Sequence, residues 1–364
     1  MDQRVQTAQT ESVDPIAVLG AGAWGTAIAI HLARAKSSDA LAAATPVLLW
    51  ARDPQHRDAL RRDGENRRYL PGFRLGSGVR VADSLEEALD QSSMVLLAVP
   101  LAALRPLSQH LGKTAARGPS TPVLVWLCKG IETATGLLPH QIAEQCCPEL
   151  EGAALSGPSF AQEVAAGLPT ALVAASSTRR CIDAVRRALH HFSCRVYASE
   201  DVAGVELGGA LKNVMAIAAG VSDGLGMGHN ARAALLTRGL AEIARLGVAL
   251  GARAQTFMGL SGLGDLLLTA TSDLSRNRQV GLRLAHGESL AHILKTLGHV
   301  AEGVSTCATA LQLAACHKVE LPITQAVGDL LCGNCSPKQA VHALLARDFR
   351  QENESPPGHS RHWA

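Results

Sequence analysis

The chain has 364 residues, of which 47% are apolar, 3% aromatic and 18% charged, and its formal net charge is +2. This length allows two ordinary domains with sizeable cores. The near-neutral charge and scarce aromatic residues argue against a nucleic-acid partner, which needs a basic stripe and stacking platforms. No apolar run approaches the ~18 to 20 residues that span a bilayer, and residues 1–14 read as a loose polar leader, not a secretory signal. We expect a cytoplasmic globular protein with a small-molecule partner and no membrane span.

Nine cysteines, an odd number without regular spacing, indicate reduced thiols. Cys332 and Cys335 form a C-x-x-C pair, but no second pair and no nearby His pair completes a zinc set. We therefore expect this pair to be structural and predict no metal site.

Short Val- and Leu-rich runs alternate with helix-like segments from Ile16 to about Val196. This alternation is typical of βαβ units, and it predicts a mainly parallel sheet covered on both faces. The predicted strands span residues 16–20, 47–50, 94–100, 123–128, 153–158 and 170–175.

After about Ala203 the chain changes to long Ala-, Leu- and Gly-rich stretches with helical spacing and few strand formers. The predicted division is an α/β domain over residues 15–202, an all-helical domain over 203–348, and a disordered polar tail over 349–364. Residues 36–46 form an insertion that is longer than a usual connection between a helix and a strand, and we assign it no role.

The first strand-like run leads into three glycines, Gly20, Gly22 and Gly25, which open a helix. In a dinucleotide site the first glycine permits a tight turn, the second lets backbone approach a pyrophosphate, and the third lets the helix pack closely on the strand. The helix N-terminus then offers free N–H groups to the phosphates. The context of strand, glycines and helix predicts a Rossmann-type dinucleotide site, and a merely structural turn is the alternative.

The second predicted strand runs into Arg52 and Asp53. A site selective for NAD usually places a carboxylate here for the ribose 2′-OH, whereas an arginine suits a 2′-phosphate. Because Arg52 comes first, we expect NADP to be accepted, and the sequence leaves the choice between NADP and NAD open. The alternative is an ordinary exposed arginine paired with Asp53.

Polar groups interrupt or end apolar runs in four later segments. These groups are Lys129 with Gly130, Gly157 to Ser159, Lys212 with Asn213, and Asp265 followed by Ser275 to Asn277. Ligands in open α/β sheets bind at the carboxyl ends of strands, where Lys129 lies. Burying an unpaired Lys212 among small apolar residues is costly, which favours a functional role. Structural alternatives remain: a solvated strand end for Lys129, a simple turn at Gly157 to Ser159, a surface charge at Arg276 and a purely structural role for Lys212.

Seven stretches carry a family resemblance. They are "GAGAWGTA", "NRRYLPG", "LVWLCKGIE", "LSGPSFAQEVAAGLPT", "GVELGGALKNVMAIAAGVSDGLG", "TFMGLSGLGDLLLT" and "SRNR", in this order. With them the chain closely resembles the bacterial-type NAD(P)-dependent glycerol-3-phosphate dehydrogenases from about Ile16 to about Gly333. The resemblance implies interconversion of dihydroxyacetone phosphate and sn-glycerol 3-phosphate with NAD(P)H, supplying glycerol 3-phosphate for phospholipid synthesis. The oligomeric state stays open, a homodimer included.

The resemblance also implies site residues. Besides Gly20, Gly22 and Gly25, the cofactor residues are Ala23, Trp24, Arg52, Lys129, Ala161, Arg276, Val300 and Glu302. The substrate residues are Lys129, Gly157, Ser159, Lys212, Asp265, Ser275, Arg276 and Asn277, with Lys212 as proton donor or acceptor. Family members often have Ser or Asn at the position of Ala23, so one side-chain contact to the pyrophosphate is missing here.

The residues present can perform this chemistry. Ketone reduction needs a hydride and a proton, and a positioned lysine can deliver the proton and stabilise the developing negative charge. Arg276, with its short polar neighbours, can hold a phosphate by forked hydrogen bonds. Two rivals remain: another two-domain hydroxyacid reductase, which would not need the phosphate set around Arg276, and a nucleotide sensor without turnover, which should have lost Lys212 or Asp265.

Overall fold

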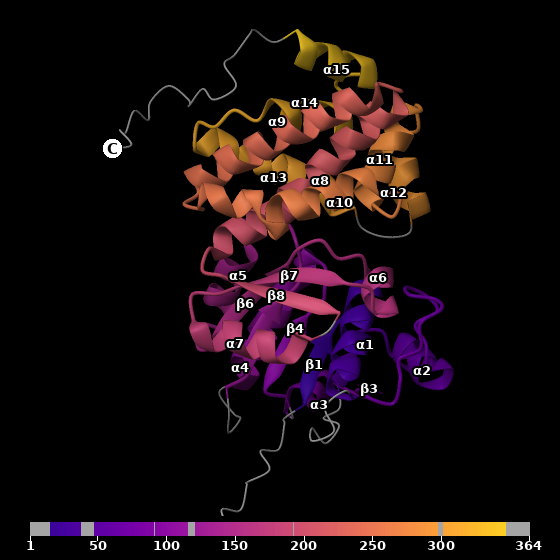
Figure 1. Cartoon of the computed structure of the whole chain (residues 1–364), viewed down its shortest axis with the longest axis vertical. Coiled ribbons are helices and arrows are strands. Elements are labelled where there is room, and N and C mark those ends of the chain that lie inside the picture. Colours follow the sequence, from indigo (N-terminus) through magenta and orange to yellow (C-terminus); the bar gives the residue numbers. More distant parts are fainter. Residues whose placement is uncertain are drawn as a thin grey trace, which may run out of the picture.

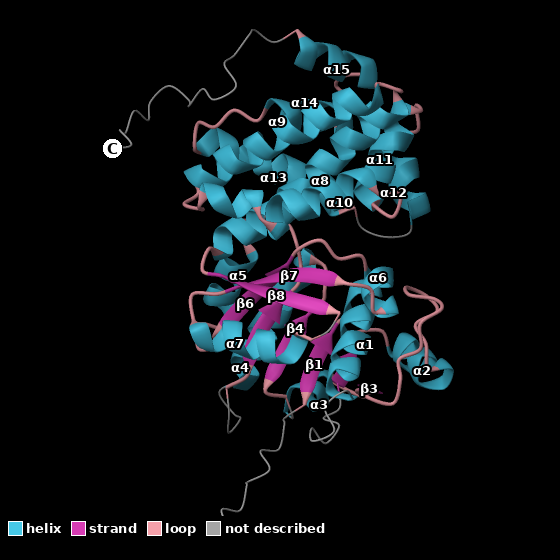
Figure 2. Ribbon diagram, viewed as in Figure 1, coloured by secondary structure: helices cyan, strands magenta, loops and turns pink. Residues whose placement is uncertain are grey.

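The computed structural model describes residues 15–37, 47–90, 92–115, 121–191, 193–297 and 301–346. The predicted leader, most of the predicted insertion and the predicted tail lie outside these residues. Within them the chain forms a part built on a β-sheet and a part built of helices (Figures 1 and 2).

The described strands form one eight-stranded sheet in the order β3-β2-β1-β4-β5-β6-β7-β8. The strands from β3 to β6 are parallel, β7 runs antiparallel to β6, and β8 is parallel to β7. The order of the first six strands is that of the dinucleotide-binding Rossmann sheet. The strands are β1 (Ile16–Leu19), β2 (Val47–Trp50), β3 (Val79–Val81), β4 (Met94–Leu97), β5 (Val123–Trp126), β6 (Gly152–Ser156), β7 (Thr170–Ala175) and β8 (Cys194–Ser199).

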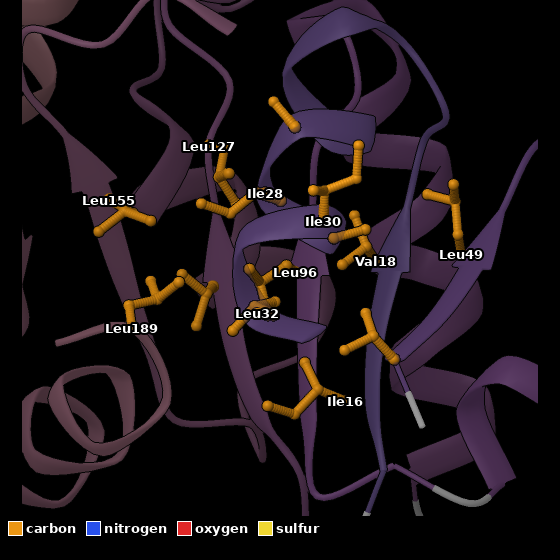
Figure 3. Packing of buried hydrophobic residues seen from close by; sticks show 14 of the residues in the cluster. Ile16, Val18, Ile28, Ile30, Leu32, Leu49, Leu96, Leu127, Leu155 and Leu189 are labelled. Carbon is orange, nitrogen blue, oxygen red and sulfur yellow. The ribbon is translucent and has the colours of Figure 1, made fainter. Parts of the chain in front are cut away.

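Successive residues of β1, β4 and β5 enter separate cores on the two faces of the sheet. In β1, Ile16 and Val18 belong to one core, and Ala17 and Leu19 belong to the other. The first core packs under α1 and α7 and is seen in Figure 3, while α4 and α5 cover the second. The helices of this part are α1 (Ala23–Ser37), α2 (Pro54–Asp63), α3 (Leu85–Asp90), α4 (Leu101–Ala115), α5 (Pro139–Cys146), α6 (Ala161–Ala166) and α7 (Arg179–Leu189).

The helical part is organised around α8, which packs most extensively against α11 and α10. A Cβ on Gly220 of α8 would lie 2.0 Å from the carbonyl oxygen of Arg278, and one on Gly281 of α11 would lie 2.0 Å from that of Ile217. Only glycine therefore allows this close crossing. The helices are α8 (Val202–Gly224), α9 (Gly228–Ala249), a 3₁₀ turn (Ala254–Met258), a π-helical turn (Leu260–Gly264), α10 (Asp265–Thr271), α11 (Arg276–Ala285), α12 (Leu290–Leu297), α13 (Glu302–Cys316), α14 (Pro322–Leu331) and α15 (Pro337–Leu345).

Helix α8 is long and apolar enough to cross a membrane, but 89% of its most apolar window is buried inside the structure. Burial of that kind is typical of the central helix of a folded core, where water-facing surface is minimal.

The structure confirms the predicted fold class, a mainly parallel sheet followed by helices. The sequence did not predict β3 and β8, because β3 has three residues and β8 exposes Arg195, Tyr197 and Ala198 and so has no continuous apolar run. The predicted division at residues 202 and 203 stays a prediction; α8 begins at Val202. All nine cysteines are free thiols, Cys332 and Cys335 included.

Candidate active site

The glycine turn between β1 and α1 has the form that the sequence predicts. Gly20 has a φ of +114°, and a Cβ on it would lie 2.4 Å from the carbonyl oxygen of Ala98. A Cβ on Gly25 would lie 1.9 Å from the carbonyl oxygen of Gly20, so the helix touches the turn directly. At Gly22, by contrast, a Cβ would meet no atom of the described residues within 4 Å. The turn therefore packs tightly against the protein at Gly20 and Gly25 and leaves space at Gly22. The first-turn N–H groups of α1 lie beside this space and lack intrahelical acceptors, so they suit a pyrophosphate.

The "NRRYLPG" stretch is fastened to this turn by Asn66. The Asn66 amide donates to the carbonyl oxygen of Ala21 at 2.9 Å and to Thr26 Oγ1 at 2.6 Å, and the side chain is buried. Two segments far apart in the sequence therefore form one wall of the candidate nucleotide site.

Arg52 is exposed directly after β2, and Asp53 next to it is engaged elsewhere. Asp53 caps α2 by accepting from the N–H of Gln55 at 3.0 Å, and it lies 3.6 Å from Arg68 in an ion pair. A cavity of about 240 Å³ lies beside it, lined in part by Asp53, His56 and Arg68. The alternative of an Arg52–Asp53 pair is thus not what the structure shows; Arg68 is the arginine paired with Asp53.

Two lysines from different parts of the chain share one buried carboxylate. Lys129 follows β5, and its Nζ lies 2.5 Å from Asp265 Oδ2. Lys212, in the middle of α8, donates to Asp265 Oδ1 and also to Thr269 Oγ1 at 2.9 Å. Asp265 is 1% exposed and Lys212 is 7% exposed. One carboxylate therefore holds two ammonium groups together at the junction of the sheet and the helices.

Burial lowers the pKa of Lys212 to about 7, the attraction of Asp265 opposes this shift, and the charge of Lys129 adds to it. A lysine with a pKa near neutrality can exchange a proton at physiological pH, which suits a general acid or base.

The π-helical turn before α10 sets the position of Asp265. A Cβ on Gly262 in this turn would lie 2.1 Å from the carbonyl oxygen of Phe257, and a Cβ on Gly208 of α8 would lie 2.6 Å from that of Ser261. The turn is therefore pressed against α8, which brings the first residue of α10 to Lys212. Single π-helical turns are frequent at functional sites.

The start of α11 places three predicted residues in different environments. Ser275 is the N-cap and accepts from the N–H of Arg278 at 3.2 Å, whereas Arg276 is exposed. Asn277 donates from Nδ2 to Asn213 Oδ1 at 3.0 Å and accepts from the N–H of Gly303 at 3.1 Å. Asn277 thus ties α11 to α8 and α13.

Glu302, at the start of α13, faces the same cluster. Burial raises its pKa, and the positive charges of Arg276, Lys129 and Lys212 act in the opposite direction. Glu302, which the resemblance assigns to the cofactor site, therefore lies close to Arg276, Lys129 and Lys212, which it assigns to the substrate site. Val300, predicted beside the cofactor, lies outside the described residues.

The loop after β6 approaches this cluster from the sheet. Gly157 has a φ of +134°, and Ser159 Oγ donates to its carbonyl oxygen at 3.0 Å. A Cβ on Gly264, next to Asp265, would lie 3.6 Å from Pro158. Ala161 begins the short helix α6, and Ala23 and Trp24 begin α1.

Three further buried polar residues beside the site were not predicted from the sequence. Thr269 accepts from Lys212 and donates to the carbonyl oxygen of Asp265 at 2.6 Å. Arg278 is buried between Asp223 at 2.7 Å and Asp273 at 2.6 Å. Glu206 is buried on α8. The only sequence signal is position: Thr269 lies one helical turn after Asp265, and Arg278 ends "SRNR".

The comparisons with known proteins concern the sequence and the fold of the chain. Sequence models for the N-terminus and the C-terminus of NAD-dependent glycerol-3-phosphate dehydrogenase match residues 15–182 and 201–342. A glycerol-3-phosphate dehydrogenase (NAD(P)+) from Leptothrix cholodnii is 52% identical, with 93% of this chain and 99% of that protein covered. One from Acidovorax ebreus is also 52% identical, with 92% and 98% covered.

Among solved structures, the glycerol-3-phosphate dehydrogenase of Coxiella burnetii superposes with a TM-score of 0.85 at 38% identity, covering 92% of this chain and 99% of that one. Two family models in the expected order, together with relatives at this identity, confirm the resemblance found in the sequence motifs. The chain therefore belongs to the NAD-dependent glycerol-3-phosphate dehydrogenase family.

Proposed function

We propose that the protein interconverts dihydroxyacetone phosphate and sn-glycerol 3-phosphate with NADPH or NADH. The observation that carries the proposal is the buried group in which Asp265 holds Lys212 and Lys129, in a member of this family. Buried ammonium groups are costly unless they are paired, and a pair of them at one carboxylate suits an oxygen that becomes negative during reaction.

In the direction of reduction, a nicotinamide cofactor held along the glycine turn would supply the hydride, with its two electrons, that C2 of the ketone needs. Lys212 gives a proton to the C2 oxygen, so the products are a secondary alcohol and the oxidised cofactor. Asp265 and Thr269 hold the Lys212 ammonium, while Lys129 adds a second positive charge near the developing alkoxide. In oxidation, neutral Lys212 takes the proton back.

The substrate phosphate binds at the start of α11. Arg276 supplies a planar fork of donors that matches phosphate oxygens, and its exposed side chain can close onto them. Ser275 and Asn277 keep a free donor each beyond the contacts described above, and Gly157 and Ser159 line the opposite side.

The cofactor binds along the glycine turn. Gly20, Gly22, Ala23, Trp24 and Gly25 present the N-terminus of α1 to the pyrophosphate, and Arg52 lies where the adenosine ribose ends. The remaining residues of the cofactor site are Lys129, Ala161, Arg276, Val300 and Glu302.

One assay tests the activity. Purified protein is mixed with dihydroxyacetone phosphate and with NADH or NADPH in turn, and loss of the reduced-nicotinamide absorbance is followed. Turnover is expected with this substrate and not with 2-oxo acids or 3-oxo acids of similar size. Turnover of the acids alone would favour the hydroxyacid reductase, and cofactor binding without any turnover would favour the sensor.

We further propose that the enzyme works in the cytoplasm, supplies glycerol 3-phosphate for phospholipid synthesis and forms a homodimer. The metabolic role is tested by deleting the gene and asking whether added glycerol 3-phosphate restores growth and phospholipid labelling. Light scattering on the purified protein tests the dimer.

A further inference from the structure

Glu206 lies on α8 and accepts three hydrogen bonds from the sheet part of the protein. Trp126 Nε1, at the end of β5, donates to Oε1 at 2.6 Å, and the backbone N–H of His140 donates to the same oxygen at 2.9 Å. His140 Nδ1 lies 2.6 Å from Oε2. Glu206 is 5% exposed, so the carboxylate is enclosed by these donors.

The carboxylate also occupies the N-terminus of α5, which begins at Pro139. A negative charge there is favourable because first-turn N–H groups are unpaired and the helix dipole is positive. Glu206 therefore links α8 to β5 and to α5 at a single point.

This link lies less than two helical turns before the candidate acid on α8. Gly209 is three positions after Glu206 and three before Lys212, so it is a surface neighbour of both along the helix. A Cβ on Gly209 would lie 3.4 Å from Cγ of Lys129, which shows that α8 rests directly on the Lys129 stem. In β5, Trp126 precedes Lys129 by three residues.

The β5 segment and α8 are thus joined at two points. Trp126 meets Glu206 at one point, and Lys129 meets Lys212 through Asp265 at the other. A buried carboxylate contributes little net stability, because desolvation offsets its contacts, but its directional hydrogen bonds fix one relative placement.

We propose that Glu206 is a positioning residue that fixes α8 against β5 and thereby sets the placement of Lys212 relative to Lys129 and Asp265. The inference rests on the proposed function for its catalytic meaning, but the placement itself can be measured in the resting protein. The charged groups that face Lys212 are Lys129 after β5, Asp265 on α10 and Glu302 on α13. Those that face Glu206 are His140 and the Cys128 thiol.

The test compares Glu206→Ala, which removes all three acceptor contacts, with Glu206→Gln, which keeps an acceptor for Trp126 and the His140 N–H. The control is Glu242→Ala. Glu242 is also a buried carboxylate, but it accepts from Ile323 and Thr324 at the start of α14. The first measurement is the pKa of Lys212 in the protein without ligands, from the ¹³Cε shift of labelled lysine, assigned with Lys212→Arg. The second is kcat and KM for dihydroxyacetone phosphate.

Loss of the link is expected to admit water to Lys212 and move Lys129 away, so Glu206→Ala should raise the Lys212 pKa from about 7 toward its ordinary value. Because misplacement by about 1 Å can cost about 10²-fold, kcat should fall at least about tenfold, with KM changing less. Glu206→Gln should keep the Lys212 pKa and kcat close to those of the parent. Glu242→Ala should lower the Tm. It should leave the Lys212 pKa unchanged and kcat within about threefold of the parent.

A folded Glu206→Ala protein with an unmoved Lys212 pKa and a parental kcat overturns the inference. An equal effect of Glu242→Ala does so as well, because it would show a general loss of packing. If Glu206→Ala does not fold, Trp126→Phe removes one donor and keeps the carboxylate, and it must shift the Lys212 pKa in the same direction. A parent without turnover would defeat the proposed function, while the pKa measurement would still decide the placement.

Discussion

Lys212 and Asp265 form a buried ion pair between α8 and α10, although 53 residues separate them in the sequence. The pair has a third member, because the other carboxylate oxygen of Asp265, Oδ2, lies 2.5 Å from Lys129 Nζ. Asp265 therefore neutralises one of two neighbouring positive charges. The remaining positive charge is available to an oxygen of the substrate, and it also lowers the pKa of Lys212.

Replacing Lys212 with Ala should reduce kcat at saturating substrate by about 10² to 10⁴-fold, the range typical for loss of a general acid. The fold should persist because Asp265 keeps its contact with Lys129. Cofactor binding, measured by NADH fluorescence or calorimetry, should stay close to that of the parent. Lys295→Ala, at an exposed position of α12, is the control. A kcat within about threefold of the parent would show that Lys212 is not the acid.

The pH dependence should have opposite signs in the two directions. With a pKa of about 7, Lys212 carries its proton below neutrality and loses it above. Reduction needs the protonated form, so its kcat/KM should fall as pH rises through about 7, by about tenfold per unit at the limit. Oxidation needs the neutral form, so its kcat/KM should rise over the same interval. Initial rates from pH 5.5 to 9 measure both, and a reduction profile that is flat across pH 7 would contradict the assignment.

Local sequence signals predicted the parts of the site that local geometry determines. The turn at Gly20 requires a φ of +114° and a backbone approach that only glycine allows, so the motif alone locates it. The buried runs of β1, β4 and β5 are likewise apolar throughout, as strands covered on both faces must be.

Contacts between distant segments could not be predicted in this way. Trp126, His140 and Glu206 meet around one carboxylate, but each looks like an ordinary core or surface residue in its own segment. The ion-pair partner of Asp53 is a second example. The sequence offered the neighbouring Arg52 as the partner, whereas the fold brings Arg68 to Asp53 from a later loop. Alternatives of this kind differ only in tertiary placement, which periodicity does not encode.

Arg52→Ala should raise the KM for NADPH more than the KM for NADH. Arg52 is exposed at the end of β2, and Asp53 is engaged with α2 and Arg68, which leaves Arg52 to contact a 2′-phosphate. Loss of a hydrogen bond to a charged group costs about 1.5 to 3 kcal/mol, or roughly tenfold to 150-fold in KM. NADH serves as the internal control because it lacks the phosphate. Equal changes for both cofactors would mean that Arg52 does not contact it.

Arg276→Lys should raise the KM for dihydroxyacetone phosphate despite the retained charge, by about tenfold. A point ammonium cannot reproduce the planar fork of a guanidinium, and the start of α11 is fixed by Ser275 and Asn277, so the backbone cannot adjust to a shorter reach. Arg179→Lys, at an exposed position of α7, is the matched control. Steady-state kinetics at fixed NADH provide the measurement, and an unchanged KM would place the phosphate elsewhere.

Alanine at Gly22 and at Gly25 should separate cofactor binding from stability. Within the part of the chain that the structure describes, a Cβ on Gly22 meets no atom within 4 Å, so Gly22→Ala should keep the Tm of the parent. It places a methyl group on the open side of the turn, where the pyrophosphate is proposed to lie, and should weaken NADH binding by tenfold or more, as about 1.4 kcal/mol implies. A Cβ on Gly25 lies 1.9 Å from the carbonyl oxygen of Gly20, so Gly25→Ala should destabilise the fold by about 1 to 3 kcal/mol, or more, through overpacking. Thermal unfolding with and without NADH measures both effects. If Gly22→Ala binds NADH as the parent does, the pyrophosphate does not approach this turn, and the cofactor site proposed here is misplaced.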